Sequence, residues 1–294
     1  MPVRVIESRQ NVRLKELRKA LAAPGREAHG LVGIEGPKML EEALRAGLRV
    51  ATVFAAQGSE RLVDELRLPG ETEILCLPKK LLHAAMATET PWPVAALVET
   101  PNWSWEQVLR RNEMLLALVL AGVQDPGNLG TILRSAEAFG ATGVVSLPGT
   151  VSAWNAKAVR ASAGSVFRVP LIATSADECF ARLHGAGAMI WATVASRAKA
   201  ANEVNLARAT ALVIGNEGNG VPAELLERAD ALVTIPCPGP VESLNAAVAT
   251  GVLLYEAARQ RAVSHTFSAA ASRTEERMGQ RNGKQRSGNR RARR

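Results

Sequence analysis

The sequence is poor in cysteine, in histidine and in long apolar runs, and each shortage excludes a class of protein. Only three of the 294 residues are cysteines (Cys76, Cys179 and Cys237), and they are far apart and lack the paired spacing of zinc ligands. Their odd number argues against a disulfide framework and favours a reducing compartment. The four histidines are scattered, so we assign none to chemistry and predict no metal site.

Membrane and secreted classes are also disfavoured. The longest apolar run, residues 114–123, is well short of the roughly 20 residues of a membrane-spanning helix. The first five residues, MPVRV, lack the apolar stretch of a signal peptide. The 47% hydrophobic content suits globular cores, and the length suits about two domains. These features predict a cytoplasmic protein without a membrane partner.

The net charge of +8 is concentrated at one end of the chain. Residues 264–294 hold nine Lys or Arg against two Glu, which leaves +7 in this segment. The segment is also rich in Ser, Gly, Gln and Asn, a composition that predicts a disordered basic tail. Such a tail binds a phosphate backbone by releasing counterions, without reading sequence. A merely solubilising role is the alternative.

Residues 1–100 read as a first α/β domain. Strand-like runs at 31–34, 50–55, 73–77 and 94–98 alternate with helical patterns at 37–46, 60–66 and 79–86. An earlier helix is expected after an N-cap at Ser8, with Val12, Leu14, Leu17 and Leu21 as its apolar positions. Alternation of this kind predicts a sheet covered by helices. Residues 101–111 are expected to be a linker, followed by a second domain at 112–263.

The second domain opens with a buried strand at 115–120, a polar loop and a helix at 129–139, followed by a strand at 143–147. The apolar residues of this helix fall on one face, and Arg134 lies about 140° from Leu129, off that face. A solvated arginine that pairs with Glu137 at i+3 would explain Arg134 equally well. The pattern alone does not decide between a functional and a surface arginine.

Two later apolar strands each end in a polar loop. Residues 212–214 lead into Gly215-Asn216-Glu217-Gly218-Asn219-Gly220, and residues 233–235 lead through a proline-rich loop to Glu242-Ser243-Leu244-Asn245 and an Ala/Val-rich helix. Ligands bind at the carboxyl ends of parallel strands, so the two loops together indicate a pocket for a polar small molecule. A dinucleotide oxidoreductase is disfavoured, because the G-x-G-x-x-G spacing is absent and Glu217 would repel a pyrophosphate.

Three segments resemble the motifs of one family in order and separation: residues 128–136, 214–220 and 235–249. The family is the SpoU (TrmH) group of SPOUT RNA ribose 2′-O-methyltransferases. The first domain, with Glu35-Gly36-Pro37-Lys38, is similar to the L30e-like substrate-binding domain of members that act on ribosomal RNA. The resemblance implies an L30e-like α/β domain followed by a SPOUT α/β domain with a deep trefoil knot, a rare exception to unknotted folding.

The resemblance also implies an activity: transfer of a methyl group from S-adenosylmethionine to a ribose 2′-hydroxyl, with 23S ribosomal RNA favoured over transfer RNA. It implies a homodimer with the active site at its interface. The implied catalytic residues are Arg134, Asn128, Glu217, Ser243 and Asn245. The implied cofactor-binding residues are Gly215, Asn216, Gly218, Gly220, Ile235, Pro236, Cys237 and Leu244. Because the sulfonium leaves as a neutral thioether, the reaction needs no metal.

Two questions stay open at this level. The family pattern implies that Arg134 is the base for the 2′-hydroxyl, yet a guanidinium holds its proton strongly, so Arg134 is equally suited to clamp a phosphate and stabilise an alkoxide. A catalytically silent RNA-binding protein is the competing class, and the intact motif residues disfavour it. Cys237 stands where the family often has Met, and we interpret it as a packing residue rather than a nucleophile.

Overall fold

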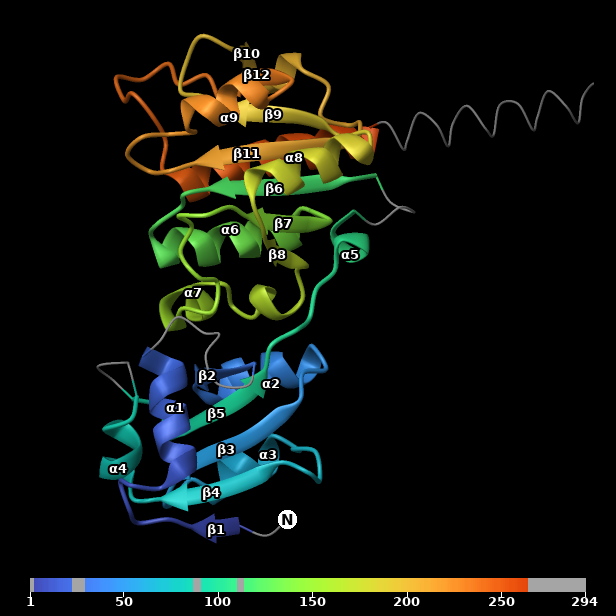
Figure 1. The fold of residues 1–294 in the computed structure, drawn as a ribbon. Coiled ribbons are helices and arrows are strands. Elements are labelled where there is room, and N and C mark those ends of the chain that lie inside the picture. The colour runs from blue at the N-terminus through green and yellow to red at the C-terminus, as the bar shows by residue number, and fades with distance from the viewer. Residues whose placement is uncertain (1–2, 23–29, 87–90, 110–113, 264–294) are drawn as a thin grey trace, which may run out of the picture.

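The computed structural model describes residues 3–22, 30–86, 91–109 and 114–263, and within them the chain forms two α/β units stacked end to end (Figure 1). The first unit runs from blue to teal in Figure 1 and the second from green to red. The expected basic tail, 264–294, and part of the expected linker lie outside the described residues. No helix in the described ranges is both long and apolar enough to cross a bilayer.

The first unit is built on a five-stranded mixed sheet in the order β1-β4-β3-β5-β2. Strands β1, β4 and β3 run parallel, whereas β5 is antiparallel to both β3 and β2. Short β-branched and aliphatic runs form these strands, as the alternating pattern predicts. Their bounds are β1 Val3–Val5, β2 Leu31–Glu35, β3 Val50–Ala56, β4 Glu73–Leu77 and β5 Val94–Glu99. The helices are α1 Val12–Ala22, α2 Pro37–Arg45, α3 Glu60–Glu65 and α4 Lys79–His83.

The helix expected after Ser8 is present as α1, but it begins later than predicted. The Asn11 side chain accepts a hydrogen bond from the Leu14 N–H, whereas the Ser8 hydroxyl accepts from the Gln10 N–H, which precedes the helix, so Asn11 rather than Ser8 caps α1. Leu14, Leu17 and Leu21 are buried, but Val12 is 69% exposed. At 100° per residue Val12 lies about 160° from Leu14, so including it in the apolar face was wrong.

The second unit contains a seven-stranded sheet whose neighbouring strands are all parallel, in the order β10-β12-β9-β11-β6-β7-β8. The strands are β6 Leu116–Ala121, β7 Gly143–Ser146, β8 Leu171–Ala173, β9 Met189–Thr193, β10 Lys199–Ala200, β11 Thr210–Gly215 and β12 Ala231–Thr234. Every residue of β6 and β11 is buried, which explains their continuous apolar sequences. The predicted parallel interior strands are therefore confirmed.

Helices cover both faces of this sheet. On one face lie α6 (Pro126–Ala138), α7 (Ala156–Ala161) and a helix over residues 246–263, which pack against Leu116, Leu118 and Leu120. On the other face lie α5 (Trp105–Leu109), α8 (Ala176–Gly185) and α9 (Ala223–Arg228), which pack against alternate residues such as Val119. Two 3₁₀ turns, η1 (Ser165–Phe167) and η2 (Ala201–Glu203), complete the described elements. The period-two alternation along β6 thus divides the core into two layers.

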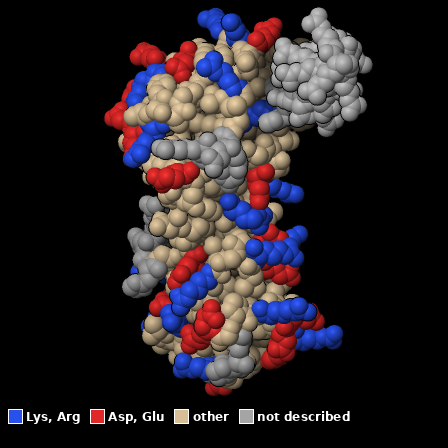
Figure 2. Space-filling model, turned by 90° about the vertical axis from the view of Figure 1, so that its right-hand side faces the viewer, with Lys and Arg blue, Asp and Glu red and all other residues tan. Residues whose placement is uncertain are grey.

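Helix α5 occupies part of the expected linker. Its Val108 is fully buried, and a Cβ added to Gly143 of β7 would come within 2.8 Å of the Val108 side chain. This close contact attaches α5 to the second sheet. In the view of Figure 2, basic and acidic side chains are interspersed along both units. The positive excess of the sequence therefore belongs mainly to residues 264–294 rather than to this face.

Candidate functional site

The carboxyl ends of β9, β11 and β12 meet at one edge of the second sheet, because these neighbouring strands are parallel. A cavity of about 440 Å³ opens at this edge. Its lining comes from the residues after β9, from the loop after β11, and from the loop that joins β12 to the last helix. This is the position and the size range in which α/β proteins bind small molecules.

The loop after β11 is folded tightly on itself. Asn216 and Gly220 exchange backbone hydrogen bonds of 2.9 Å, and the Asn216 side chain accepts from the N–H groups of Gly218 and Asn219. The same side chain donates to the Gly122 carbonyl, just after β6, at 2.8 Å. Asn216 lines the cavity, but its amide is already engaged in shaping the loop.

Gly215 is the tightest point of this loop. A Cβ on Gly215 would lie 2.0 Å from the Gly220 carbonyl carbon and 2.2 Å from the Val221 nitrogen. Such distances leave no room for any side chain. Gly220 itself has φ +68°, the left-handed region that glycine adopts without strain. The two glycines therefore let the backbone form one wall of the cavity.

Glu217 ties this loop to the start of α6. Its carboxylate accepts hydrogen bonds from the backbone N–H groups of Gln124 and Asp125 at 3.2 Å each and from the Asn128 amide at 2.9 Å. Burial by itself would raise the pKa of Glu217, but these hydrogen bonds outweigh it, and the pKa is lowered. Glu217 is therefore an anion at neutral pH.

A second amide extends the connection to the last helix. The Asn245 amide donates to the Asn128 side-chain oxygen at 3.0 Å, and the Asn245 oxygen accepts from the N–H groups of Ala247 and Val248. Asn245 is thus the N-cap of the helix over 246–263. Glu217, Asn128 and Asn245, from three distant segments, form one hydrogen-bonded chain beside the cavity.

The start of α6 is fixed independently. Asp125 caps the helix by accepting from the Asn128 N–H at 2.8 Å, and its carboxylate also pairs with Lys157 of α7 at 2.9 Å. Hydrogen bonds from Lys157 and from the Asn128 N–H lower the pKa of Asp125. Pro126 at the first helical position starts α6 three residues before the expected Leu129. Asn128 is consequently held in the first turn of a capped helix.

Arg134 lies six residues beyond Asn128, about 9 Å along the axis of α6 at 1.5 Å per residue. Its side chain is exposed, as its position off the apolar face predicts. Within the part of the chain that the structure describes, Arg134 makes no hydrogen bond or ion pair. The alternative pairing with Glu137 is wrong, because the Glu137 carboxylate binds Arg168 instead.

The cavity brings together most, but not all, of the predicted site residues. Those that line it are Gly215, Asn216, Glu217, Gly218, Gly220, Ile235, Cys237, Ser243 and Leu244. Asn128 and Asn245 do not line the cavity but are connected to it by hydrogen bonds, because Asn245 bonds Asn128 and Asn128 bonds Glu217. Pro236 and Arg134 are not part of the cavity wall. Cys237 is half-buried, and its thiol donates to the Ile235 carbonyl at 3.4 Å.

The contribution from the end of β9 and the residues that follow it was not anticipated. Thr193, Val194 and Ala195 line the cavity, and the Thr193 hydroxyl donates to the Val213 carbonyl of β11 at 2.9 Å. Recognising 189–193 as a strand would have placed Thr193 at the same sheet edge. Among the described residues, no group of three or more His, Cys, Asp or Glu side chains is arranged to hold a metal ion.

A parallel α/β sheet with a cavity at its carboxyl edge, lined by glycines and two carboxylates, is typical of a protein that binds a polar or cationic small molecule. Comparison with known families specifies the class. The model of the SpoU rRNA Methylase family matches residues 115–255, and the MRM3-like substrate binding domain matches residues 11–96. The chain belongs to the SpoU rRNA methylase family.

Relatives are similar over most of their length. The 23S rRNA (guanosine(2553)-2′-O)-methyltransferase RlmP of Bacillus subtilis is 35% identical over 254 residues, which cover 85% of this chain and 97% of RlmP. An AdoMet-bound rRNA methyltransferase from Sinorhizobium meliloti superposes with a TM-score of 0.75 at 29% identity, covering 87% of this chain and 98% of that one. The SpoU methyltransferase AviRb from Streptomyces viridochromogenes, in complex with AdoMet, superposes with a TM-score of 0.76 at 28% identity. The superposition covers 86% of this chain and 98% of AviRb.

The volume and the lining of the cavity are compatible with S-adenosylmethionine. The cavity volume lies in the range of sites for ligands of this size, and the tightly folded backbone from Gly215 to Gly220 forms one of the cavity walls. Among the described residues that line it, the charged ones are Glu217 and Glu242. An anionic lining is complementary to the sulfonium and ammonium charges of the cofactor.

Proposed function

We propose that the protein methylates a ribose 2′-hydroxyl in 23S ribosomal RNA, with S-adenosylmethionine as methyl donor. The hydrogen-bonded chain of Glu217, Asn128 and Asn245 beside an anion-lined cavity carries this proposal. The family and the relatives that act on 23S ribosomal RNA support it. When bound, the cofactor supplies a methyl group on a sulfonium that leaves as a neutral thioether.

The residues of the cavity wall hold the cofactor. The backbone from Gly215 to Gly220 packs against it, and Ile235 and Leu244 contribute apolar contacts from the facing loop. The carboxylates of Glu217 and Glu242 favour its cationic end. Pro236 and Cys237 shape the turn that follows β12, where backbone groups are free to recognise the adenine and ribose.

Arg134 acts on the RNA. Its exposed, uncommitted guanidinium is available to the ribose and to the neighbouring phosphate, either as the base for the 2′-hydroxyl or as a cation that stabilises the developing alkoxide. Ser243 and Asn245, at the cavity edge, position the ribose against the methyl group. Holding the two reactants in line supplies much of the rate enhancement.

The active form is a homodimer. The helix over 246–263 exposes Val248, Val252 and Tyr255, at i, i+4 and i+7 on one face, with exposures of 53%, 40% and 56%. Tyr255 also contacts Phe139, which ends α6, edge to face at 6.0 Å. The apolar strip thus continues toward the helix that carries Arg134, which supports an interface that adjoins the active site.

An aspartate at Val252 tests the dimer. Sedimentation of Val252→Asp is expected to give a monomer, because a charge would be desolvated in the apolar interface. Val12→Asp, at a valine with 69% exposure on α1, is the matched control and should sediment as the wild type does. A dimeric Val252→Asp variant would exclude this helix as the interface.

We also propose the family's domain plan: an L30e-like RNA-binding domain at 1–100, a linker at 101–111, a methyltransferase domain with a trefoil knot at 112–263 and a basic tail at 264–294. Support for a knot comes from membership of the SpoU family. The ribosomal substrate and the cysteine usage favour action in the cytoplasm.

Mapping of 2′-O-methylated nucleotides tests the function. RNA from a strain that lacks the gene is expected to lose one methylated ribose in 23S RNA, and the restored gene should return it. Loss from a transfer RNA instead would support the alternative substrate. No change in the map, together with no S-adenosylmethionine binding by calorimetry, would support a silent RNA-binding protein and refute the proposal.

A further inference from the structure

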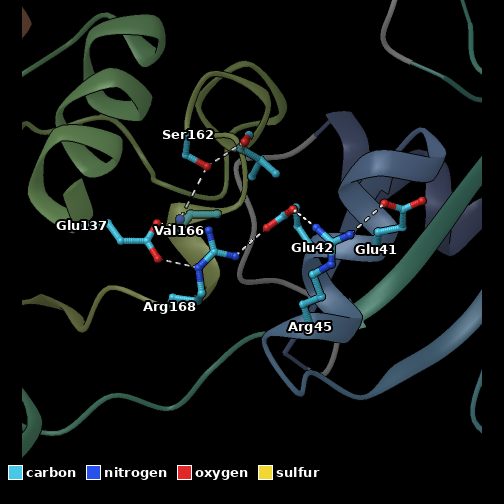
Figure 3. A network of polar contacts seen from close by, with 8 residues as sticks. Glu41, Glu42, Arg45, Glu137, Ser162, Val166 and Arg168 are labelled. Atoms are coloured by element: carbon cyan, nitrogen blue, oxygen red, sulfur yellow. Dashed lines mark hydrogen bonds and ion pairs between the residues drawn. The ribbon is translucent and has the colours of Figure 1, made fainter.

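Arg168 joins the two α/β units. It follows η1 in the second unit, and its Nη1 donates to Glu42 Oε2 of α2, in the first unit, at 2.7 Å. Its Nε and Nη2 donate to Glu137 Oε1 and Oε2 of α6 at 2.5 and 3.1 Å. Figure 3 shows the guanidinium between the two carboxylates. We name Glu42, Arg168 and Glu137 the interdomain bridge.

The bridge differs from an ordinary surface ion pair. Glu42 is 13% exposed, Arg168 33% and Glu137 35%, so solvent screens the charges only in part. Arg168 binds Glu137 with two parallel hydrogen bonds, the geometry that gives the strongest arginine–carboxylate pairs. Hydrogen bonding from Arg168 lowers the pKa of Glu137, and hydrogen bonding to Glu137 raises the pKa of Arg168. Both charges therefore persist around neutral pH.

Close packing accompanies these charges. Gly164, with φ +91°, lies against Glu42, and a Cβ at Gly164 would come 2.7 Å from the Glu42 Cβ. One hydrophobic cluster also runs through both units and includes Ile34 of β2 and Leu133 of α6. The junction is thus a packed contact with a charged centre, which fixes one orientation of the two units.

The bridge ends on the helix that carries the proposed chemistry. Glu137 stands three residues after Arg134, and the same helix begins at Asn128 beside Glu217. We propose that the interdomain bridge fixes the position of RNA bound to the first unit relative to Arg134 on α6. In this role Glu42 and Arg168 are positioning residues. This inference rests on the proposed RNA methylation and adds a role for residues outside the cofactor cavity.

Glu42→Gln tests the bridge because it removes the charge on the first unit and leaves the Arg168–Glu137 pair intact. It also weakens the pair between Glu42 and Arg45 of the same helix, at 2.8 Å. The adjacent Glu41→Gln is the matched control, because it also removes a pair with Arg45, at 3.5 Å, while Glu41, 47% exposed, has no other ion pair among the described residues. In steady-state methylation of a 23S RNA fragment, Glu42→Gln is expected to raise KM for RNA about fivefold, the effect of one partly screened charged contact, with kcat changed less than about twofold. Cofactor affinity, measured by calorimetry, should not change.

Two further measurements separate positioning from loss of folding. Arg168→Lys keeps the charge but loses the paired hydrogen bonds, so its KM should lie between those of the wild type and Glu42→Gln. Hydrogen exchange should quicken in α2 and in residues 163–168 of Glu42→Gln, but not in Glu41→Gln. This readout needs no RNA or activity, so it tests the bridge even if the wild type methylates nothing.

The outcomes are distinct. A wild-type KM in Glu42→Gln, with wild-type exchange at the junction, would refute the bridge while leaving the proposed function in place. An inactive wild type that binds no cofactor would refute the proposed function. A raised KM in Glu42→Gln and an unchanged KM in Glu41→Gln would establish Glu42 and Arg168 as positioning residues.

Discussion

Asn245 has two roles that different substitutions separate. Its oxygen caps the helix over 246–263, and its NH₂ group donates to Asn128 at 3.0 Å. Asn245→Ala removes both interactions. Asn245→Asp keeps an oxygen for the cap, where a negative charge also suits the helix dipole, but places an oxygen against the Asn128 oxygen.

The magnitudes follow from these contacts. Loss of an N-cap costs about 1 kcal/mol, which lowers Tm by about 2–4 °C in a domain of 150–250 residues, and Asn245→Ala should show this decrease. Asn245→Asp keeps the cap but loses the hydrogen bond to Asn128, so its Tm should fall less than that of Asn245→Ala. Loss of the hydrogen bond to Asn128 is worth about 0.5–1.5 kcal/mol, so turnover should fall about threefold to tenfold in both variants.

Thermal unfolding and methyl transfer with saturating cofactor are the assays. Asn202→Ala is the control, because Asn202 is exposed and makes no side-chain hydrogen bond within the described ranges. It should match the wild type in both measurements. If Asn245→Asp lost as much Tm as Asn245→Ala, or turned over at the wild-type rate, the division of roles would be refuted.

Three other substitutions address the rest of the site. Arg134→Ala should lower turnover about 100-fold, which in practice abolishes methylation, while cofactor binding measured by calorimetry stays unchanged. Near-normal turnover would contradict the role of Arg134. Gly215→Ala should weaken cofactor binding at least about tenfold, because its Cβ would lie 2.0 Å from the Gly220 carbonyl carbon. The lowered pKa of Glu217 gives a stability contribution that is complete above the ordinary glutamate pKa and is lost as pH falls through the folded-state pKa. Glu217→Gln should therefore flatten the acid limb of the unfolding free energy, and an unchanged limb would argue against these hydrogen bonds.

The sequence predicted the elements whose patterns are long or bounded by clear breakers. The apolar runs around β6 and β11 have no polar interruption, and both are buried strands as expected. The 3.6-residue period of α6 placed Arg134 outside the buried face, where the structure has it. These features depend only on local periodicity, which the sequence contains in full.

Short elements and helix starts escaped prediction. Within residues 148–209, α7 has six residues, β8 three and β10 two, too few for a period to show. Helix α8, with ten residues and an N-cap at Ser175, and strand β9, with five, were long enough to detect and were missed. The start of α6 at Asp125 and Pro126 was detectable, because Asp followed by Pro is a known helix-start signal. Apolar periodicity alone begins only at Leu129, so it placed the start too late.

Long-range partners were beyond the reach of local rules. The i+3 rule paired Glu137 with Arg134, but the structure pairs it with Arg168, 31 residues away in sequence. Likewise, the resemblance placed Asn128, Glu217 and Asn245 in one site, whereas their order of connection, with Asn128 in the middle, required coordinates. Tertiary contacts override weak local preferences of this kind.

The helix over 246–263 is held by side-chain hydrogen bonds at both of its ends. Asn245 holds its start beside the cavity, and Arg261 donates to the carbonyls of Met114, Leu115, Leu206 and Arg208 at the opposite edge of the sheet. Desolvation lowers the pKa of Arg261, although a guanidinium remains charged. A surface that is immobile before a partner arrives loses little conformational entropy on association. The exposed valines and Tyr255 on this helix are therefore a preorganised surface.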